Sequence, residues 1–353
     1  MHRTSRAVAA LLLAAPLAAA GCGGGDKPRA VRPTPVPTTP KPVAVPLTPQ
    51  VAARQFQTYV ANEDVARAAA DERLALTWTS DGQSQLTAAA FRKAAFDGDP
   101  VSRYAYGTPK LYVPRLKPDV FPQWFVASVR RSEQGEEKSA RTALMAFILR
   151  GPSDRWKLSL TTLLAPKAKE PKVLLDQEGY AAPLADDDTS VLIRPRDVQG
   201  IQATIASEGP GSVASRIMKQ GPVTTGYFRQ ANAAKKKAKA KDLTQTVVYV
   251  ATPFPFFPLR TQHGGALVLY GMFRNTVIGA KDKQNDKPPI PSEAEHLMDG
   301  VVEGNEISMT VTYQFAAYDP PRAKGKDKAQ PKADVVADAG ELTKATAPPP
   351  KKP

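Results

Sequence analysis

Residues 124–164 read WFVASVRRSEQGEEKSARTALMAFILRGPSDRWKLSLTTLL and contain three apolar runs. Their aromatic, aliphatic and β-branched residues are typical of strands. Turn-forming residues at 132–139 and 151–154 separate the runs. A shorter run of the same kind, Leu111-Tyr112-Val113, precedes them. Because short connections join antiparallel strands, this part of the chain predicts an antiparallel meander.

Helical patterns precede the meander. Apolar residues recur near helical spacing from residue 51 to Thr79, which predicts one or two helices with a break near Asn62, and a further helix is expected over 87–94. The caps and turns that mark the helix ends are Thr48-Pro49, Asp81-Gly82, Thr87, and Gly98 with Pro100. Helices followed by an antiparallel sheet are typical of an α+β domain.

The second half of the chain follows the same plan. We expect helical segments first and strands after them, in this order: helices at Pro195–Ala206 and Thr224–Lys241, then strands at 246–251, 266–278, 307–318 and 334–345. Tyr112-Val113 with Phe121-Pro122 matches Tyr249-Val250 with Phe257-Pro258, and each Phe-Pro leads into an apolar strand that ends in arginine. Such internal similarity favours duplication, and chance likeness between β-rich segments is the alternative.

An export signal opens the chain. Arg3 and Arg6 precede an apolar run at 7–20, and Ala19-Ala20-Gly21 comes directly before Cys22. A basic start, a short apolar run and a small-residue cleavage site form such a signal, and the run is too short to span a bilayer. The segment resembles bacterial lipoprotein signals. That resemblance implies a lipid on the sulfur of Cys22, which would anchor the mature chain at the extracytoplasmic face of the cell membrane.

An ordinary secretory signal with an incidental thiol is the alternative for Cys22. It is the only cysteine of the 353 residues, so the mature chain has no internal disulfide and depends on hydrophobic burial for stability.

The proline-rich composition after Cys22 is typical of an extended stalk. The expected division is a signal peptide at 1–21, a disordered stalk at 22–47, a first α+β domain at 48–170, a connector at 171–193, a second α+β domain at 194–346 with a disordered Lys-rich insertion near 319–333, and a disordered tail at 347–353.

The distribution of positive charge argues against a nucleic-acid partner. The net charge is +14, but lysines and arginines concentrate in segments that composition assigns to linkers and loops, above all 235–241 and 322–332. A nucleic-acid reader would instead carry a basic patch with interleaved aromatic residues on a folded face. Solvated lysines that keep a loop soluble are one interpretation of these segments. Attraction to anionic headgroups or cell-wall polymers is the other.

Two halves of helices followed by three or four antiparallel strands resemble the cone-shaped fold of cystatin-like and nuclear-transport-factor-like domains. Together with the signal and the stalk, they make the chain similar to an uncharacterised family of secreted actinobacterial lipoproteins. The resemblance implies an α+β fold of two similar cone-like domains, covering most of residues 50–346. It implies no catalytic residue, because that family has no assigned activity.

Motifs for chemistry are scarce. His263 and His296 are the only histidines after the signal, which excludes a multi-histidine metal site. His296 follows two glutamates, but a zinc-binding helix needs a second histidine four residues away, so we expect a short loop helix there. Asp186-Asp187-Asp188 is contiguous rather than alternating and favours a solvated connector over a calcium loop. No catalytic, metal or cofactor site is predicted.

Aromatic residues give the one positive indication of binding. Phe254, Phe256 and Phe257 alternate with prolines, which do not occur inside a central strand, so the segment is an edge, a bulge or a loop. Exposed rings near a cone mouth would contact a ligand or partner, whereas core packing is the alternative.

The sequence thus predicts a lipid-anchored, non-catalytic binding or interaction module, with another envelope protein or wall polymers as partners. The alternatives are a cone-fold hydrolase or isomerase, and a structural adaptor that contacts anionic wall polymers.

Overall fold

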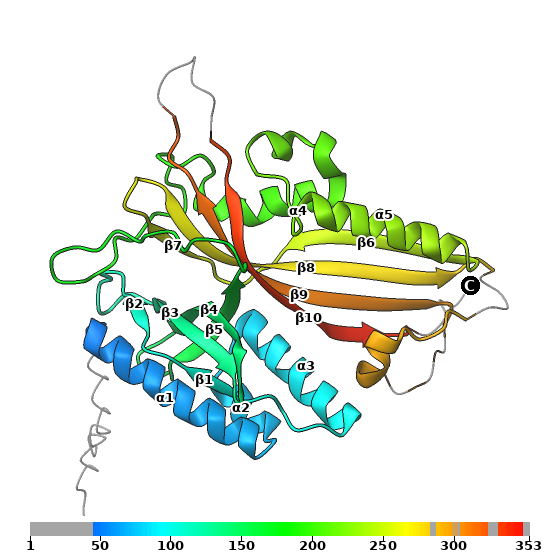
Figure 1. Cartoon of the computed structure of the whole chain (residues 1–353), viewed down its shortest axis with the longest axis horizontal. Coiled ribbons are helices and arrows are strands. Elements are labelled where there is room, and N and C mark those ends of the chain that lie inside the picture. The colour runs from blue at the N-terminus through cyan, green and yellow to red at the C-terminus, as the bar shows by residue number, and fades with distance from the viewer. Residues whose placement is uncertain are drawn as a thin grey trace, which may run out of the picture. The chain divides into compact units, whose positions relative to one another are not determined.

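A computed structural model describes residues 45–282, 287–298, 300, 302, 304–323 and 331–348. The predicted signal peptide, Cys22, most of the stalk and nearly all of the tail lie outside the described residues. Within them, ten strands form one sheet in which every pair of neighbouring strands is antiparallel (Figure 1). The α+β class is therefore confirmed.

The first half contributes three helices and five strands: α1 (Pro49–Ala68), α2 (Glu72–Thr77), α3 (Asp81–Asp97), β1 (Tyr104–Tyr106), β2 (Lys110–Tyr112), β3 (Gln123–Glu133), β4 (Glu136–Leu149) and β5 (Lys157–Leu164). Thr48 caps α1 as predicted, its hydroxyl accepting from the Val51 amide at 3.2 Å. The break expected near Asn62 is wrong. Glu63 and Arg67 form a buried ion pair one turn apart, which stabilises the helix through this region.

Asp81-Gly82 does not form the expected turn but begins α3. The Asp81 carboxylate accepts hydrogen bonds from Ser80, Arg150 and Ser159 at 2.6 to 2.8 Å. These bonds attach the start of the helix to the sheet, which is why the helix begins six residues earlier than Thr87. Gly98 ends it in a left-handed conformation, as the sequence predicted.

The second half contributes α4 (Val198–Glu208), α5 (Thr225–Lys239) and five strands: β6 (Leu243–Ala251), β7 (Phe257–Arg260), β8 (Ala266–Ala280), β9 (Glu306–Asp319) and β10 (Asp334–Thr346). Short 3-10 turns are η1 (Pro195–Asp197), η2 (Gly209–Gly211), η3 (Val213–Arg216) and η4 (Ser292–Leu297). β1 and β2 both pair with β3, and β6 and β7 both pair with β8. The two halves thus share a strand plan, but the Phe-Pro match does not follow it, since Phe121-Pro122 precedes β3 whereas Phe257-Pro258 begins β7.

The expected separation into two cone-like domains is not confirmed. The sheet runs in the order β1-β3-β4-β5-β10-β9-β8-β6, so the last strand of each half pairs with the other. Ala337 lies opposite Leu164 and Asp338 opposite Leu163. Each half alone would leave an edge strand with unpaired backbone groups, and this pairing covers part of both edges. The described residues accordingly all belong to one compact unit.

Three clusters of buried side chains hold this unit together. One lies between α1 and the sheet, and another between α4, α5 and the long strands of the second half. In the third, the opposite face of β3–β5 packs against residues of β7, β8 and β9. Alternation along the strands explains the arrangement, since Phe125 joins the α1 cluster and Val126 the third cluster.

Residues of the predicted connector, 171–193, contribute to two of these clusters. Val173 and Ala181 belong to the third cluster, and Val191 and Ile193 belong to the α4 and α5 cluster. The predicted insertion at 319–333 is likewise ordered at its ends. Asp319 closes β9 and accepts from the Ile193 amide, and Ala333 bridges to Met218. Residues 324–330 lie outside the described residues.

Candidate functional site

Of the three phenylalanines predicted as ligand contacts, Phe257 is buried, and Phe254 and Phe256 are half-buried against other side chains. Phe257 is 1% exposed in the third cluster, and Phe256 packs against the α4 and α5 cluster. Phe254 meets Phe273 edge to face, with ring centroids 5.4 Å apart. Phe257 begins β7, which pairs with β8 alone among the named strands and is therefore an edge strand. None of the three rings lines the cavity beside α5 or the cavity where β5 meets β10.

The histidines and the acidic run lie apart from one another. His263 follows β7 in a turn, and His296 lies in η4, the short loop helix that was predicted, with its ring 6.5 Å from Phe96. Asp188 forms an ion pair with Arg260 at 2.7 Å, so this member of the acidic run contacts the folded surface. The described residues contain no group of three or more His, Cys, Asp or Glu side chains arranged to hold a metal ion.

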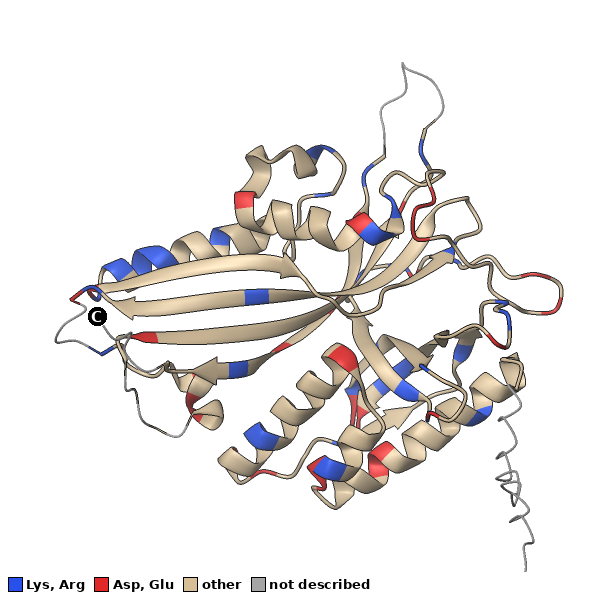
Figure 2. Ribbon diagram, turned by 180° about the vertical axis from the view of Figure 1, so that it is seen from behind, with Lys and Arg blue, Asp and Glu red and all other residues tan. Residues whose placement is uncertain are grey.

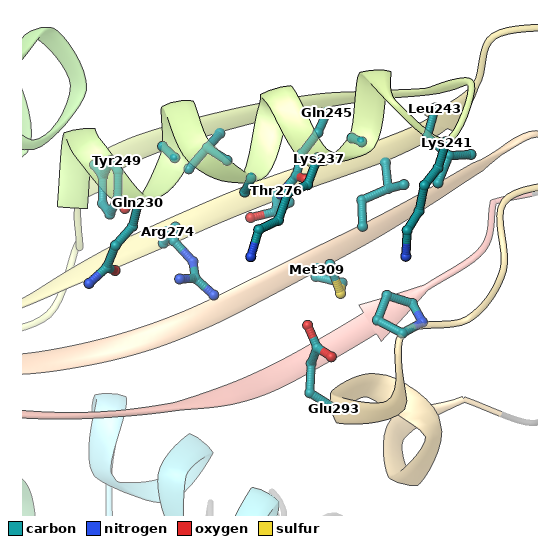
Figure 3. A pocket seen from close by; sticks show the side chains of 16 residues that line it. Gln230, Lys237, Lys241, Leu243, Gln245, Tyr249, Arg274, Thr276, Glu293 and Met309 are labelled. Carbon is teal, nitrogen blue, oxygen red and sulfur yellow. The ribbon is translucent and has the colours of Figure 1, made fainter.

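A groove of about 360 Å³ lies between α5 and the strands β6, β8 and β9 (Figure 3). Pro291, which directly precedes η4, and Glu293, in the first turn of η4, line the other side of the groove. Alternate residues of two neighbouring strands face it, as the two-residue period of a strand requires: Leu243, Gln245, Val247 and Tyr249 from β6, and Arg274, Thr276 and Ile278 from β8. Its size is typical of small-ligand sites. We call it the α5 groove.

Small residues on α5 leave room for the groove. Ala231, Ala234 and Ala238 lie three and four residues apart and therefore share one face of the helix, which borders the cavity. Larger side chains at these positions would occupy the space between helix and sheet. The alanines, with Val247, Ile278 and Met309 from the strands, make the floor of the groove predominantly apolar.

The lysine run lies in the helix that was expected over Thr224–Lys241, and not in a loop. Lys235, Lys236, Lys237 and Lys239 occupy the last turns of α5, where Figure 2 shows them as blue bands. Positive charge stabilises a helix C-terminus, because the unpaired carbonyl groups there carry partial negative charge. The basic charge is thus held on a folded surface, which corrects the expectation that it belongs to linkers and loops.

Three cations converge on the α5 groove. Lys237 and Lys241 extend from the helix end toward the strands, and Arg274 projects from β8 (Figure 3). Within the part of the chain that the structure describes, none of the three forms an ion pair, and the buried Nε of Arg274 has no hydrogen-bond partner. The one acid in the lining, Glu293, comes from the opposite side. The groove therefore has a net positive lining.

Tyr249 lines one end of the groove and belongs to a stack of tyrosines. Tyr227 of α5 stacks on Tyr249 with centroids 5.4 Å apart and on Tyr313 at 5.1 Å, and Arg274 lies 5.9 Å from the Tyr313 ring. Burial raises the pKa of Tyr249 to about 12, with Arg274 opposing the shift, and burial also raises the pKa of Tyr313. The phenols therefore stay neutral at physiological pH, and they serve as hydrogen-bonding groups rather than as bases.

Sequence reasoning did not find this groove. A signal was present in the alternation of alanines and lysines along 231–241, where Ala234 and Ala238 share a face with Lys237 and Lys241. The contribution of Arg274 depends on the pairing of β6 with β8. That pairing brings Tyr249 directly opposite Arg274, and only the fold reveals it.

Comparisons with known proteins give a family but no activity. A domain of unknown function, DUF8094, matches residues 43–347. An uncharacterized lipoprotein of Streptomyces coelicolor is 28% identical over 76% of this chain and 77% of its own length, and another from the same organism is 25% identical over 75% and 77%. An uncharacterized lipoprotein of Streptomyces avermitilis is 29% identical over 42% of each chain. No solved structure matches. In the described part of the chain, no helix combines the length and apolar character needed to cross a membrane.

Proposed function

The chain belongs to the DUF8094 family of unknown function, and we propose that it is a lipid-anchored envelope lipoprotein that binds an anionic amphiphile in the α5 groove without transforming it. The observation that carries the proposal is the convergence of Lys237, Lys241 and Arg274, without acidic partners among the described residues, over an apolar floor. An acidic head would meet the cations, and an apolar body would cover the alanines and aliphatic side chains.

Relatives that are named lipoproteins support the anchored location. In this proposal Cys22 carries the lipid, and the folded unit reaches its ligand at the extracytoplasmic face of the membrane. Replacing Cys22 by serine should release the protein from the membrane fraction and abolish acyl labelling. Membrane retention of an unlabelled Cys22→Ser variant would contradict the anchor while leaving the groove proposal intact.

The lining of the α5 groove favours binding over catalysis. A nucleophile needs an adjacent base, and a general base needs a pKa near the working pH. The groove offers Glu293 on one side and the neutral Tyr249 on the other, with no histidine in its lining. The cone-fold hydrolase or isomerase therefore has less support than the binding module.

Three matched probes test the proposal by calorimetric titration of the full-length protein. Octyl phosphate carries both an anionic head and an apolar chain, inorganic phosphate has the head alone, and octyl glucoside has the chain with a neutral head. We expect octyl phosphate to bind most tightly. Loss of one charge-assisted hydrogen bond should weaken its binding about tenfold or more in Arg274→Gln and Lys237→Gln.

Lys236→Gln is the matched control, because Lys236 lies next to Lys237 on α5 but does not line the groove. It should bind octyl phosphate like the parent protein. Equal binding of octyl phosphate and octyl glucoside would overturn the anionic part of the proposal. Equal weakening by Lys236→Gln and Lys237→Gln would show a diffuse charge effect instead of a site.

Equal weakening by these two variants would favour the alternative function, a structural adaptor that contacts anionic wall polymers. Lys235, Lys236 and Lys239 are exposed on α5 and form no ion pair within the described part of the chain. Polymer contact would then depend steeply on salt concentration, because exposed charges are screened.

A further inference from the structure

A second cavity, of about 500 Å³, lies where the two halves of the sheet meet. Its walls come from α1, α3, β1, β3, β4, β5 and β10. The lining is mainly polar and includes Arg67, Gln83, Arg131, Arg141, Thr161 and Asp338. We call it the seam cavity. It shares no lining residue with the α5 groove, so what it binds is independent of the function proposed above.

The seam cavity is polar because β5 and β10 stop pairing beside it. β5 and β10 are paired at Leu163 and Leu164 only, so the preceding backbone of β5 needs other partners. The side chain of Gln314, from β9, supplies one by accepting from the Thr161 amide at 2.8 Å. The Thr162 hydroxyl donates to the backbone carbonyl oxygen of Gln314 at 3.0 Å. Side chains thus satisfy the backbone where the ladder ends.

Two buried polar atoms of the seam cavity are left without partners. They are Oε1 of Gln83, a residue 8% exposed, and Oγ1 of Thr161, a residue 4% exposed. Buried polar groups are almost always hydrogen-bonded, and an unpartnered one costs its full desolvation energy. A carbonyl oxygen only accepts, so Gln83 requires a donor from whatever occupies the cavity.

Two arginines face the cavity side by side. Arg131 of β3 lies directly opposite Arg141 of β4 in the sheet register, and both line the cavity. Like charges directly opposite each other in a sheet are unfavourable. Arg141 donates to the carbonyl oxygens of Leu163 and Leu164, and Arg131 lies 4.3 Å from the Tyr104 ring, but neither forms an ion pair in the described part of the chain. The backbone carbonyls of β5 already hold the guanidinium of Arg141, so Arg131 is the cation of the pair that remains open to an anion.

Acidic residues line the cavity as well. Asp338 and Glu341 lie on β10, close to the end of the β5 pairing, and Glu133 lies on β3. Burial raises the pKa of Asp338, with Arg141 opposing the shift, so a cation beside this carboxylate would complete its charge balance. Arg67 is already engaged by Glu63 at 3.0 Å and by the Ser102 carbonyl oxygen. Cavity positions for both signs of charge therefore remain open.

We propose that the seam cavity binds a small zwitterion of the amino acid or dipeptide class, with its carboxylate at Arg131 and its ammonium group toward Gln83 and the acids of β10. A flat sugar ring fits less well. The Tyr104 ring, the aromatic surface in the lining, is already contacted by Arg131 and by Arg67 at 4.6 Å. A dipeptide supplies the donor that Gln83 lacks and the anion that Arg131 lacks.

Dialanine is the probe, used with the full-length protein in calorimetric and thermal-shift titrations. N-acetyl-dialanine and dialanine amide are matched controls that each lack one charge. We expect dialanine to bind and each blocked form to bind about tenfold or more weakly, because each loses a charge-assisted contact. Arg131→Gln should weaken dialanine binding by a similar factor.

Variants of the unpartnered atoms separate a binding role from a structural one. Thr161→Val removes a hydroxyl that has no partner, so the melting temperature should stay equal or rise while dialanine binding falls. Gln83→Leu removes the unpartnered Oε1 together with the 3.4 Å bond from its amide nitrogen to the Thr87 hydroxyl, so dialanine binding should fall with a small decrease in melting temperature. Thr162→Val is the control on the next residue, since it removes a satisfied buried hydroxyl and should lower the melting temperature. Octyl phosphate binding should be unchanged in all four variants.

Three results would overturn the inference. The first is no dialanine binding at millimolar concentration to correctly folded protein. The second is equal binding of dialanine and its blocked forms. The third is a neutral disaccharide such as maltose stabilising the protein where dialanine does not, which would assign the cavity to a polyol.

Discussion

The two halves of the molecule use a helix against a sheet in opposite ways. In the first half, Phe56 and Tyr59 of α1 pack edge to face on Phe147 of β4, with centroids 6.1 and 5.3 Å apart. In the second half, α5 presents alanines to the sheet, and a cavity remains. The same arrangement of elements thus gives a filled interface or a groove, according to the size of the helix side chains.

Removing a large side chain from the filled interface between α1 and β4 should have the largest effect on stability. Phe147 is 1% exposed and also stacks on Phe125 with centroids 4.8 Å apart. Phe147→Ala should lower the free energy of unfolding by about 3 to 5 kcal/mol, because it removes buried apolar surface and leaves a cavity. Urea unfolding measures the change. Phe96→Ala, at a ring 58% exposed, is the control and should cost less than about 1 kcal/mol.

A buried acid at the end of β9 should make stability depend on pH. Burial raises the pKa of Asp319 to about 7, against the hydrogen bond from the Ile193 amide. Between pH 4 and pH 7 the folded state therefore holds a proton that the unfolded state has lost. The stability contributed by this group falls as pH rises through that window and stays low above it.

Asp319→Asn tests this linkage. The variant removes the ionisation, so its free energy of unfolding should decline less between pH 5 and pH 8 than that of the parent, by about 1 to 3 kcal/mol. Urea unfolding at both pH values gives the difference. Parallel pH profiles for the two proteins would mean that Asp319 stays ionised in the folded state.

Filling the groove should make α5 resemble α1. Ala234→Leu places a larger side chain between helix and sheet, so octyl phosphate binding should fall about tenfold or more, while stability changes by less than about 1.5 kcal/mol. Titration and urea unfolding of the same variant measure both quantities. Ala233→Leu, next to it and exposed, is the control. Unchanged binding in Ala234→Leu would remove the groove from the proposed function.

Much of the difference between the halves follows from local sequence, and part of it does not. Every strand predicted from apolar runs is present, because alternation and turn residues act locally. β1 and β7 were missed, and in β7 a proline weakens the strand pattern. The pairing of Leu164 with Ala337 joins residues far apart in sequence, and no local pattern tells which edges of two sheets will meet. The seam cavity depends on that pairing, so it could not be predicted.

The smallest effect concerns the helix ends. Both helices carry basic residues in the last turn, but Arg67 of α1 is buried in an ion pair with Glu63, whereas Lys236 of α5 is exposed. Lys236→Glu places a negative charge near the partial negative charge of a helix C-terminus and should lower the melting temperature by about 1 °C at low salt. Because the charge is exposed, the difference should vanish in 1 M salt, where the screening length is about 3 Å. A decrease that persisted in 1 M salt would mean that Lys236 contributes through packing of its aliphatic stem, as a buried basic residue does.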